Sequence, residues 1–133
     1  MKKLLPIFIT ALILVGCAGP AEQKISYRQI TMDEAVAMME DEEGYIILDV
    51  RTAAEFDEKH IPGAINIPNE AIGTEAIPEL PDKDQLILVY CRSGNRSKQA
   101  SEKLVKLGYT NVVEFGGIID WSGETQMNEG GPL

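Results

Sequence analysis

Two short apolar runs constrain the fold of this chain more than any other feature of its sequence. Residues 45–48 (YIIL) and 86–90 (LILVY) contain no charged side chain, as expected of strands that are covered on both faces. Segments with the apolar spacing of helices follow each run. Strands that alternate with helices predict an α/β domain in which helices flank a mostly parallel central sheet.

Local signals place the other elements. Thr31 followed by Glu34, and Thr52 followed by Glu55, match the capping box that starts many helices. Gly108 follows the clearest helical pattern and predicts its end. We expect strands at residues 26–30, 45–48, 64–67, 86–90 and 112–115, and helices from Thr31, at 52–59, 70–79 and 97–107, and briefly before Trp121.

Composition excludes several classes of protein. The chain has 133 residues, of which 44% are hydrophobic and 25% charged, which fits one ordered domain. Its formal net charge of -9 argues against a nucleic-acid partner, because phosphates attract Lys and Arg. Two cysteines and one histidine are too few for a disulfide-stapled scaffold, a four-cysteine zinc site or a multi-histidine metal centre. We therefore expect neither a metal nor a cofactor.

The first residues resemble a targeting signal. Lys2 and Lys3 precede residues 4–15, an uncharged stretch too short to cross a bilayer stably. Residues 14–17 (LVGC) resemble the lipobox of bacterial lipoproteins. That resemblance implies cleavage before Cys17 and lipidation of its thiol.

These signals divide the chain and predict its location. A protein lipidated at Cys17 would be anchored to a membrane on the extracytoplasmic side of the cell envelope. The sequence does not specify which membrane. We expect a lipoprotein signal peptide at 1–16, a lipidated N-terminus and tether at 17–26, a domain at 27–122 and a loose C-terminal tail at 123–133.

The segment between the best strand and the best helix carries the chemistry. Cys91 ends the apolar run, and a helix is predicted to begin at Ser97. Gly94, and also Asn95, can adopt a positive φ that curls such a segment around an anion. Sites in open α/β sheets form at the carboxyl ends of strands, which is where this loop lies.

Positive charge surrounds the Cys91 thiol. Arg92 and Arg96 lie in its loop, and a helix N-terminus adds a partial positive charge. Each favours thiolate over thiol and should lower the pKa of Cys91. A thiolate in an anion-binding loop is a nucleophile toward anionic substrates. The alternative, a buried structural cysteine, does not account for this setting.

The loop and several other stretches resemble the rhodanese family of sulfurtransferases. The resemblance implies a single rhodanese-like three-layer domain, in which Cys91 carries sulfane sulfur as a persulfide. It also implies that loop N–H groups cradle the outer sulfur and that Arg92 and Arg96 orient a small anionic donor such as thiosulfate. The matching stretches are 48–51 (LDVR), 55–56 (EF), 60–68 (HIPGAINIP), 91–97 (CRSGNRS) and 114–118 (EFGGI) with Trp121. The residues implied to bind substrate are Arg92, Ser93, Gly94, Asn95, Arg96 and Ser97.

Three other residues are expected to support the site rather than react. Asp49 and Arg51 follow the first apolar run, and we expect Arg51 to pair with Glu55, four residues later. His60 lies in a turn and is expected to be a hydrogen-bonded structural histidine.

Alternative functions remain open from the residues alone. The enzyme alternative is a cysteine-dependent phosphatase or arsenate reductase. Cysteine-dependent phosphatases have five residues between the loop cysteine and arginine, whereas Cys91 and Arg96 enclose four, which disfavours this alternative. A non-catalytic, membrane-tethered sulfur carrier is a second alternative. If Cys17 is lipidated, no second thiol can resolve a Cys91 persulfide, so the acceptor must be external: cyanide, sulfite, a small thiol or a partner protein's thiol.

Overall fold

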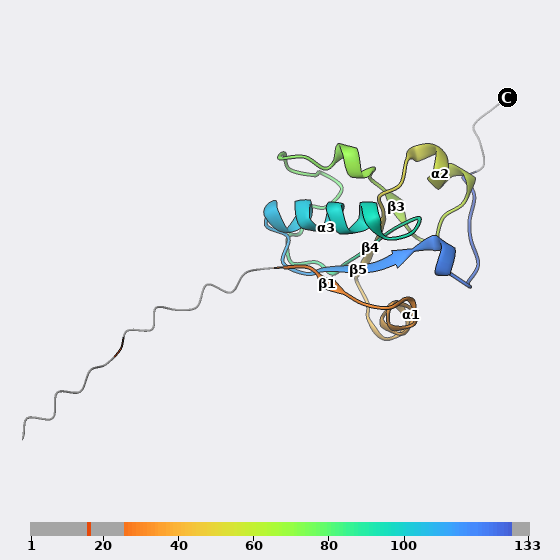
Figure 1. The fold of residues 1–133 in the computed structure, drawn as a ribbon, viewed down its shortest axis with the longest axis horizontal. Coiled ribbons are helices and arrows are strands. Elements are labelled where there is room, and N and C mark those ends of the chain that lie inside the picture. The colour runs from red at the N-terminus through yellow and green to blue at the C-terminus, as the bar shows by residue number, and fades with distance from the viewer. Residues whose placement is uncertain (1–15, 17–25, 129–133) are drawn as a thin grey trace, which may run out of the picture.

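A five-stranded parallel sheet forms the centre of the computed structural model, which describes residue 16 and residues 26–128 (Figure 1). The strand order is β1-β5-β4-β2-β3, and every neighbouring pair is parallel. The elements are β1 (Arg28–Gln29), α1 (Met32–Asp41), β2 (Ile46–Asp49), α2 (Ala53–Glu58), β3 (Ile65–Asn66), the 3-10 turn η1 (Asn69–Ala71), β4 (Ile87–Cys91), α3 (Asn95–Lys106), β5 (Val112–Gly117) and the 3-10 turn η2 (Ile118–Asp120).

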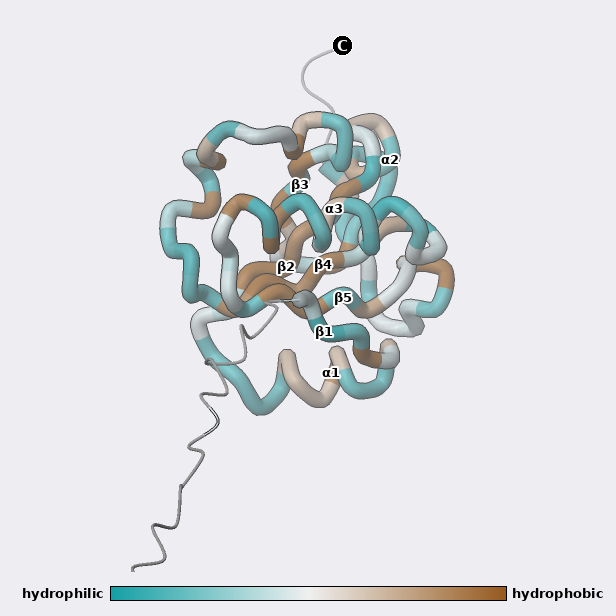
Figure 2. The backbone as a smooth tube through the Cα atoms, turned by 60° about the vertical axis from the view of Figure 1, so that its left-hand side comes forward, coloured by the Kyte–Doolittle hydropathy of each residue, from teal (hydrophilic) through white to brown (hydrophobic). Residues whose placement is uncertain are grey.

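Helices cover both faces of the sheet and complete three layers. Figure 2 shows the apolar strands β2 and β4 between α3 on one side and α1 on the other. Side chains alternate along β4, so that Leu88 and Tyr90 pack in the cluster with Ala35 of α1. Val89 and Cys91 pack in the cluster with Leu104 of α3. The predicted α/β fold with flanking helices is confirmed.

The strand register brings the predicted site to one edge of the sheet. β4 is buried along its whole length and pairs with β2 and β5. Asp49 at the end of β2 lies opposite Tyr90, and Cys91 lies opposite Gly117 at the end of β5. Because parallel strands end at the same edge, these residues meet where ligands bind in open α/β sheets.

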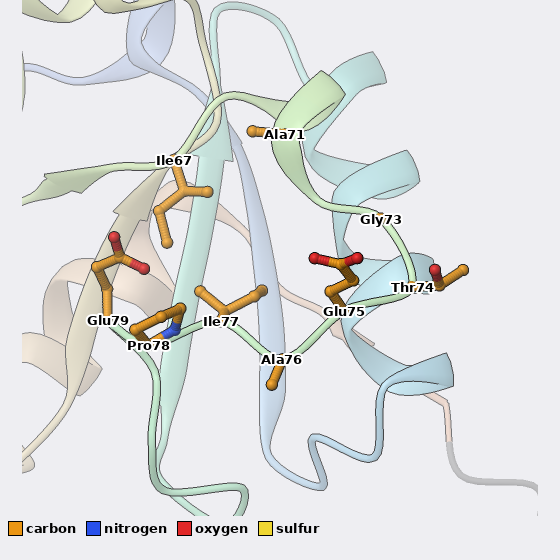
Figure 3. A pocket seen from close by; sticks show the side chains of 9 residues that line it. All are labelled: Ile67, Ala71, Gly73, Thr74, Glu75, Ala76, Ile77, Pro78 and Glu79. Carbon is orange, nitrogen blue, oxygen red and sulfur yellow. The ribbon is translucent and has the colours of Figure 1, made fainter.

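The segment after β3 differs from its prediction. A helix over 70–79 was predicted, but only η1 forms, and the chain then continues without regular structure to β4. Pro78 lacks the N–H that a helix requires, and Gly73 favours other conformations. Figure 3 shows the chain from Ala71 to Glu79 curving around a hollow of about 500 Å³.

The described part of the C-terminal segment is attached to the domain. Gln126 exchanges two backbone hydrogen bonds with His60, at 2.8 and 2.9 Å. The side chain of Asn128 donates to Asp57 in α2 at 2.7 Å. The prediction of a loose tail is therefore wrong up to residue 128, because strand-type and side-chain hydrogen bonds hold it.

The predicted signal peptide and the lipidation site at Cys17 lie outside the described residues, apart from Gly16. Within the described ranges, no helix combines the length and the apolar character needed to cross a membrane.

Candidate active site

The loop that follows β4 turns sharply into α3. Gly94 has φ +114°, a left-handed conformation that side-chain-bearing residues rarely adopt, and it forms the N-cap of α3. The helix begins at Asn95, two residues earlier than predicted, because this glycine makes the whole turn. Of the two residues able to adopt a positive φ, Gly94 does so, whereas Asn95 is the first residue of the helix. Arg96 consequently lies in the first turn of α3 rather than in the loop.

The thiol of Cys91 is buried and surrounded by hydrogen-bond donors. Cys91 is 1% exposed, and its Sγ accepts a hydrogen bond from the N–H of Gly94 at 3.0 Å. The Ser97 hydroxyl lies 3.4 Å from the same sulfur. Burial raises the pKa of the Cys91 thiol, but the hydrogen bonds from Ser97 and from loop N–H groups outweigh it, so the pKa lies below its ordinary value. The site therefore favours a thiolate, as predicted.

The backbone at the end of β5 lies in close contact with the backbone of the Cys91 loop. A Cβ placed on Gly117 would lie 1.9 Å from the carbonyl oxygen of Arg92 and 2.5 Å from the N atom of Ser93. Only glycine permits this approach of two backbones. The same Arg92 carbonyl accepts a hydrogen bond from Ile119 N at 3.3 Å. β5 and η2 thus fix the shape of the loop.

The predicted binding residues divide into buried and exposed groups. Gly94 and Ser97 are buried with the thiol, whereas Arg92, Ser93 and Asn95 face solvent. Figure 1 shows α2 and the segment after β5 at the same end of the sheet. Between them lies a cleft of about 410 Å³, lined by Arg51, Glu55, Glu58, Lys59, Arg92, Ile118 and Ile119.

Arg96 at the start of α3 is paired with Glu55 of α2. Its two terminal nitrogens donate to both oxygens of Glu55, at 2.7 and 3.0 Å. This pairing lowers the pKa of Glu55 to about 2. The predicted pair between Glu55 and Arg51 is wrong, because Arg96 takes the Glu55 carboxylate. No sequence spacing signals this pair, whose members are 41 positions apart.

Asp49, Arg51 and His60 form buried support behind the cleft. Arg51 pairs with Asp49 at 2.7 Å and donates to the carbonyl of Lys59 at 2.6 Å. His60 stacks on Phe56 with ring centroids 3.8 Å apart, and its Nδ1 lies 2.8 Å from the Phe56 carbonyl. Nδ1 must therefore carry a proton toward that oxygen. None of these contacts involves the thiol, and the supporting roles of Asp49, Arg51 and His60 remain predictions.

Sequence reasoning missed one residue in contact with the loop. Glu114 is 3% exposed, although it belongs to β5, a central strand. Its Oε1 accepts hydrogen bonds from the Ser97 hydroxyl at 2.6 Å and from Gly116 N at 2.8 Å. A charged residue inside the apolar run VVEF was the available signal, since such residues are rarely buried without a specific partner.

Comparison with known families agrees with this geometry. The model of the rhodanese-like domain matches residues 31–124, which is most of the chain. This protein belongs to the rhodanese family. Among residues 26–128, no cluster of His, Cys, Asp and Glu side chains is arranged to hold a metal ion.

Proteins similar to this chain include a sulfurtransferase and a putative sulfur carrier. Thiosulfate sulfurtransferase PspE of Escherichia coli is 40% identical over 73 residues, which are 55% of this chain and 70% of that protein. The putative sulfur carrier protein YrkF of Bacillus subtilis is 32% identical over 112 residues, which cover 84% of this chain but only 60% of YrkF. A solved structure of an E. coli rhodanese with anions is 35% identical, with a TM-score of 0.57 over 62% of this chain and 98% of that one.

Proposed function

We propose that this protein is a sulfurtransferase in which Cys91 carries sulfane sulfur from thiosulfate, or a similar anionic donor, to an external acceptor. The Cys91 thiolate attacks the outer sulfur of thiosulfate. The sulfur–sulfur bond of thiosulfate breaks, sulfite leaves with the electron pair, and Cys91 becomes a persulfide. A nucleophile such as cyanide then takes the outer sulfur, and its attack returns the electron pair to Cys91 as thiolate.

One observation carries the proposal: a buried thiol with a lowered pKa receives hydrogen bonds from a short loop at the N-terminus of α3. A thiolate held by neutral N–H groups needs no counter-ion and stays nucleophilic. The loop N–H groups and the exposed Arg92 supply positive potential for an anionic donor. Sulfite leaves as an anion, so the step requires no general acid.

The test is thiocyanate formation from thiosulfate and cyanide by the purified full chain. We expect repeated turnover in the wild type and none in Cys91→Ser, which preserves the shape of the loop. Cys17→Ser is the matched control, because it removes the other cysteine and should turn over normally. Activity that survives Cys91→Ser, or that is absent from all three proteins, would contradict the proposal for these substrates.

A sulfur carrier is the second candidate, favoured by the similarity to YrkF over most of this chain. A carrier would load Cys91 once and release the sulfur only to a partner protein's thiol. Single loading by thiosulfate, without turnover by cyanide or small thiols, would favour the carrier over the enzyme.

We further propose that the protein is held on the extracytoplasmic side of the cell envelope by lipid on Cys17. The support is the lipobox-like run before Cys17 and the uncharged stretch at residues 4–15. Metabolic labelling with a fatty-acid analogue should mark the wild type, and Cys17→Ser should lose the label and leave the membrane fraction. Equal labelling and fractionation of the two proteins would contradict the proposal.

A further inference from the structure

Three buried groups form a hydrogen-bonded chain beneath the active-site loop. Cys91, Ser97 and Glu114 come from β4, α3 and β5, and each is at most 3% exposed. Ser97 Oγ lies 3.4 Å from Cys91 Sγ and 2.6 Å from Glu114 Oε1. The sulfur and the carboxylate oxygen are therefore no more than about 6 Å apart, close enough for two charges to interact strongly in a buried site.

The Ser97 hydroxyl has one proton but several neighbouring acceptors. Glu114 Oε1 lies nearest, at 2.6 Å, and the Gly94 carbonyl lies at 2.9 Å. A hydroxyl donates one hydrogen bond at a time. An ionised Glu114 competes with the Cys91 thiolate for this proton, and whenever Ser97 donates to Glu114 it presents only lone pairs to Cys91 Sγ. That orientation suits a thiol, which can donate, and disfavours a thiolate, which cannot.

We propose that Glu114 is a positioning residue that draws the Ser97 hydroxyl proton away from Cys91 and thereby restrains ionisation of the thiol. The carboxylate acts in two ways. It removes a donor from the thiolate, and it places a like charge near that thiolate. The N–H of Gly94 and the other loop N–H groups stabilise the thiolate and so oppose the effect of Glu114. The balance between these two effects sets the reactivity of Cys91.

Few other charges face this chain of groups. On β1, the residue paired with Glu114 is the neutral Gln29, whereas Arg28 is paired with Val113 on the opposite face. On β4, the residue paired with Glu114 is the apolar Val89.

The nearby arginines provide little compensation. Arg96 at the start of α3 interacts with the Cys91 charge, but its guanidinium is bound to Glu55. Arg92 is exposed to solvent, which screens its charge. Among the described residues, Glu114 is therefore the buried charged side chain that Ser97 links to Cys91, with no arginine bound to it.

For the proposed sulfur transfer, on which this consequence rests, Glu114 would favour the loaded form. In a persulfide the charge lies on the outer sulfur, one atom farther along the side chain. Discharge returns the charge to Sγ beside Glu114. Because a thiol of higher pKa is a poorer leaving group, Glu114 should slow the release of sulfur to an acceptor.

The direct test is the pH dependence of Cys91 alkylation by iodoacetamide, in a background where Cys17→Ser leaves one reactive thiol. Glu114→Gln keeps the size of the side chain and an oxygen acceptor but removes the charge. We expect it to lower the apparent pKa of Cys91 by about one to two units. Glu114→Asp keeps the charge and should remain near the parent value. Glu102→Gln, which removes an exposed charge from α3, is the control for general charge effects.

Ser97→Ala distinguishes the relay from simple repulsion. In the parent, Glu114 competes for the Ser97 proton, so the loss of Ser97 should raise the Cys91 pKa less than it does in Glu114→Gln. In Glu114→Gln, the neutral amide oxygen competes less for the Ser97 proton than a carboxylate does, so Ser97 donates more to the thiolate and its loss should raise the Cys91 pKa clearly. An equal effect of Ser97→Ala in both backgrounds, or no shift in Glu114→Gln, would overturn the proposal.

Two further readouts keep the test decisive. Thermal unfolding establishes that each variant is folded. If Glu114→Gln is not folded, the smaller neutral variant Glu114→Ala replaces it and should lower the apparent pKa of Cys91 in the same direction; no shift there would overturn the proposal. Alkylation requires no sulfur donor, so the proposed function can fail while this inference stands. Conversely, normal thiocyanate turnover with an unchanged pKa in Glu114→Gln would overturn only the role of Glu114.

Discussion

Two arginine–carboxylate pairs lie near α2, and they differ mainly in burial. The side chains of Arg51 and Asp49 are 4% and 0% exposed, whereas those of Arg96 and Glu55 are 29% and 31% exposed. The buried pair also holds the Lys59 carbonyl and has no contact with the loop cysteine. The half-exposed pair joins α2 to the first turn of α3, beside the loop. The same chemistry therefore supports the scaffold in one place and adjusts the charge of the site in the other.

The largest effect should come from breaking the buried pair. Asp49→Asn keeps the shape of the side chain but leaves the Arg51 guanidinium buried without its counter-charge. We expect a loss of about 3–5 kcal/mol in the free energy of unfolding, measured by urea denaturation. Glu55→Gln is the matched variant and should lose about 1 kcal/mol or less, because solvent screens its pair. Equal losses in the two variants would show that burial does not separate them.

A smaller effect should appear in donor binding. Glu55→Gln frees the Arg96 guanidinium from its carboxylate partner and adds net positive charge beside the loop. We expect KM for thiosulfate to fall a few-fold at low ionic strength, with little change in kcat, and the difference to shrink as salt screens the charge. An unchanged or higher KM would show that Arg96 must be held by Glu55 to serve the site.

The smallest effect should be on acid stability. Because the pKa of Glu55 is lowered to about 2 in the folded protein, its ion pair stabilises the fold above the ordinary carboxyl pKa near 4.5. This stabilisation is lost progressively as the pH falls from 4.5 toward 2. Across this window the free energy of unfolding should fall in both proteins. We expect the fall to be smaller in Glu55→Gln than in the wild type, by about 1 kcal/mol at most after allowance for solvent screening. If the free energy of unfolding changed with pH in the same way in both proteins, the lowered pKa of Glu55 would not contribute to stability, which would contradict this prediction.

The sequence predicted those parts of the molecule whose causes are local. The apolar runs at 45–48 and 86–90 became β2 and β4 within one residue, because a strand buried on both faces needs an uninterrupted apolar stretch. Thr31 and Glu34 form the predicted capping box, whose two hydrogen bonds lie within one turn. The Cys91 loop was identified for a similar reason, since strand end, glycine and helix start are adjacent in the chain.

Features that depend on tertiary contact were missed. Sequence spacing predicts Arg51 as the partner of Glu55, but the fold brings Arg96 to it. The tight approach of Gly117 to the loop and the contact between Glu114 and Ser97 join segments separated by long stretches of chain. The segment at 70–79 has helix-forming residues, yet only η1 forms there, because Pro78 lacks the N–H that a helix requires.

Cys91 Sγ is the atom that we propose to carry the transferred sulfur. The most direct measurement is the intact mass of the full chain before and after thiosulfate, beside Cys91→Ser and Cys17→Ser. The account predicts a gain of one sulfur atom in the wild type and in Cys17→Ser, and none in Cys91→Ser. A gain that persists in Cys91→Ser, or the absence of any gain in the wild type with thiosulfate, would contradict it.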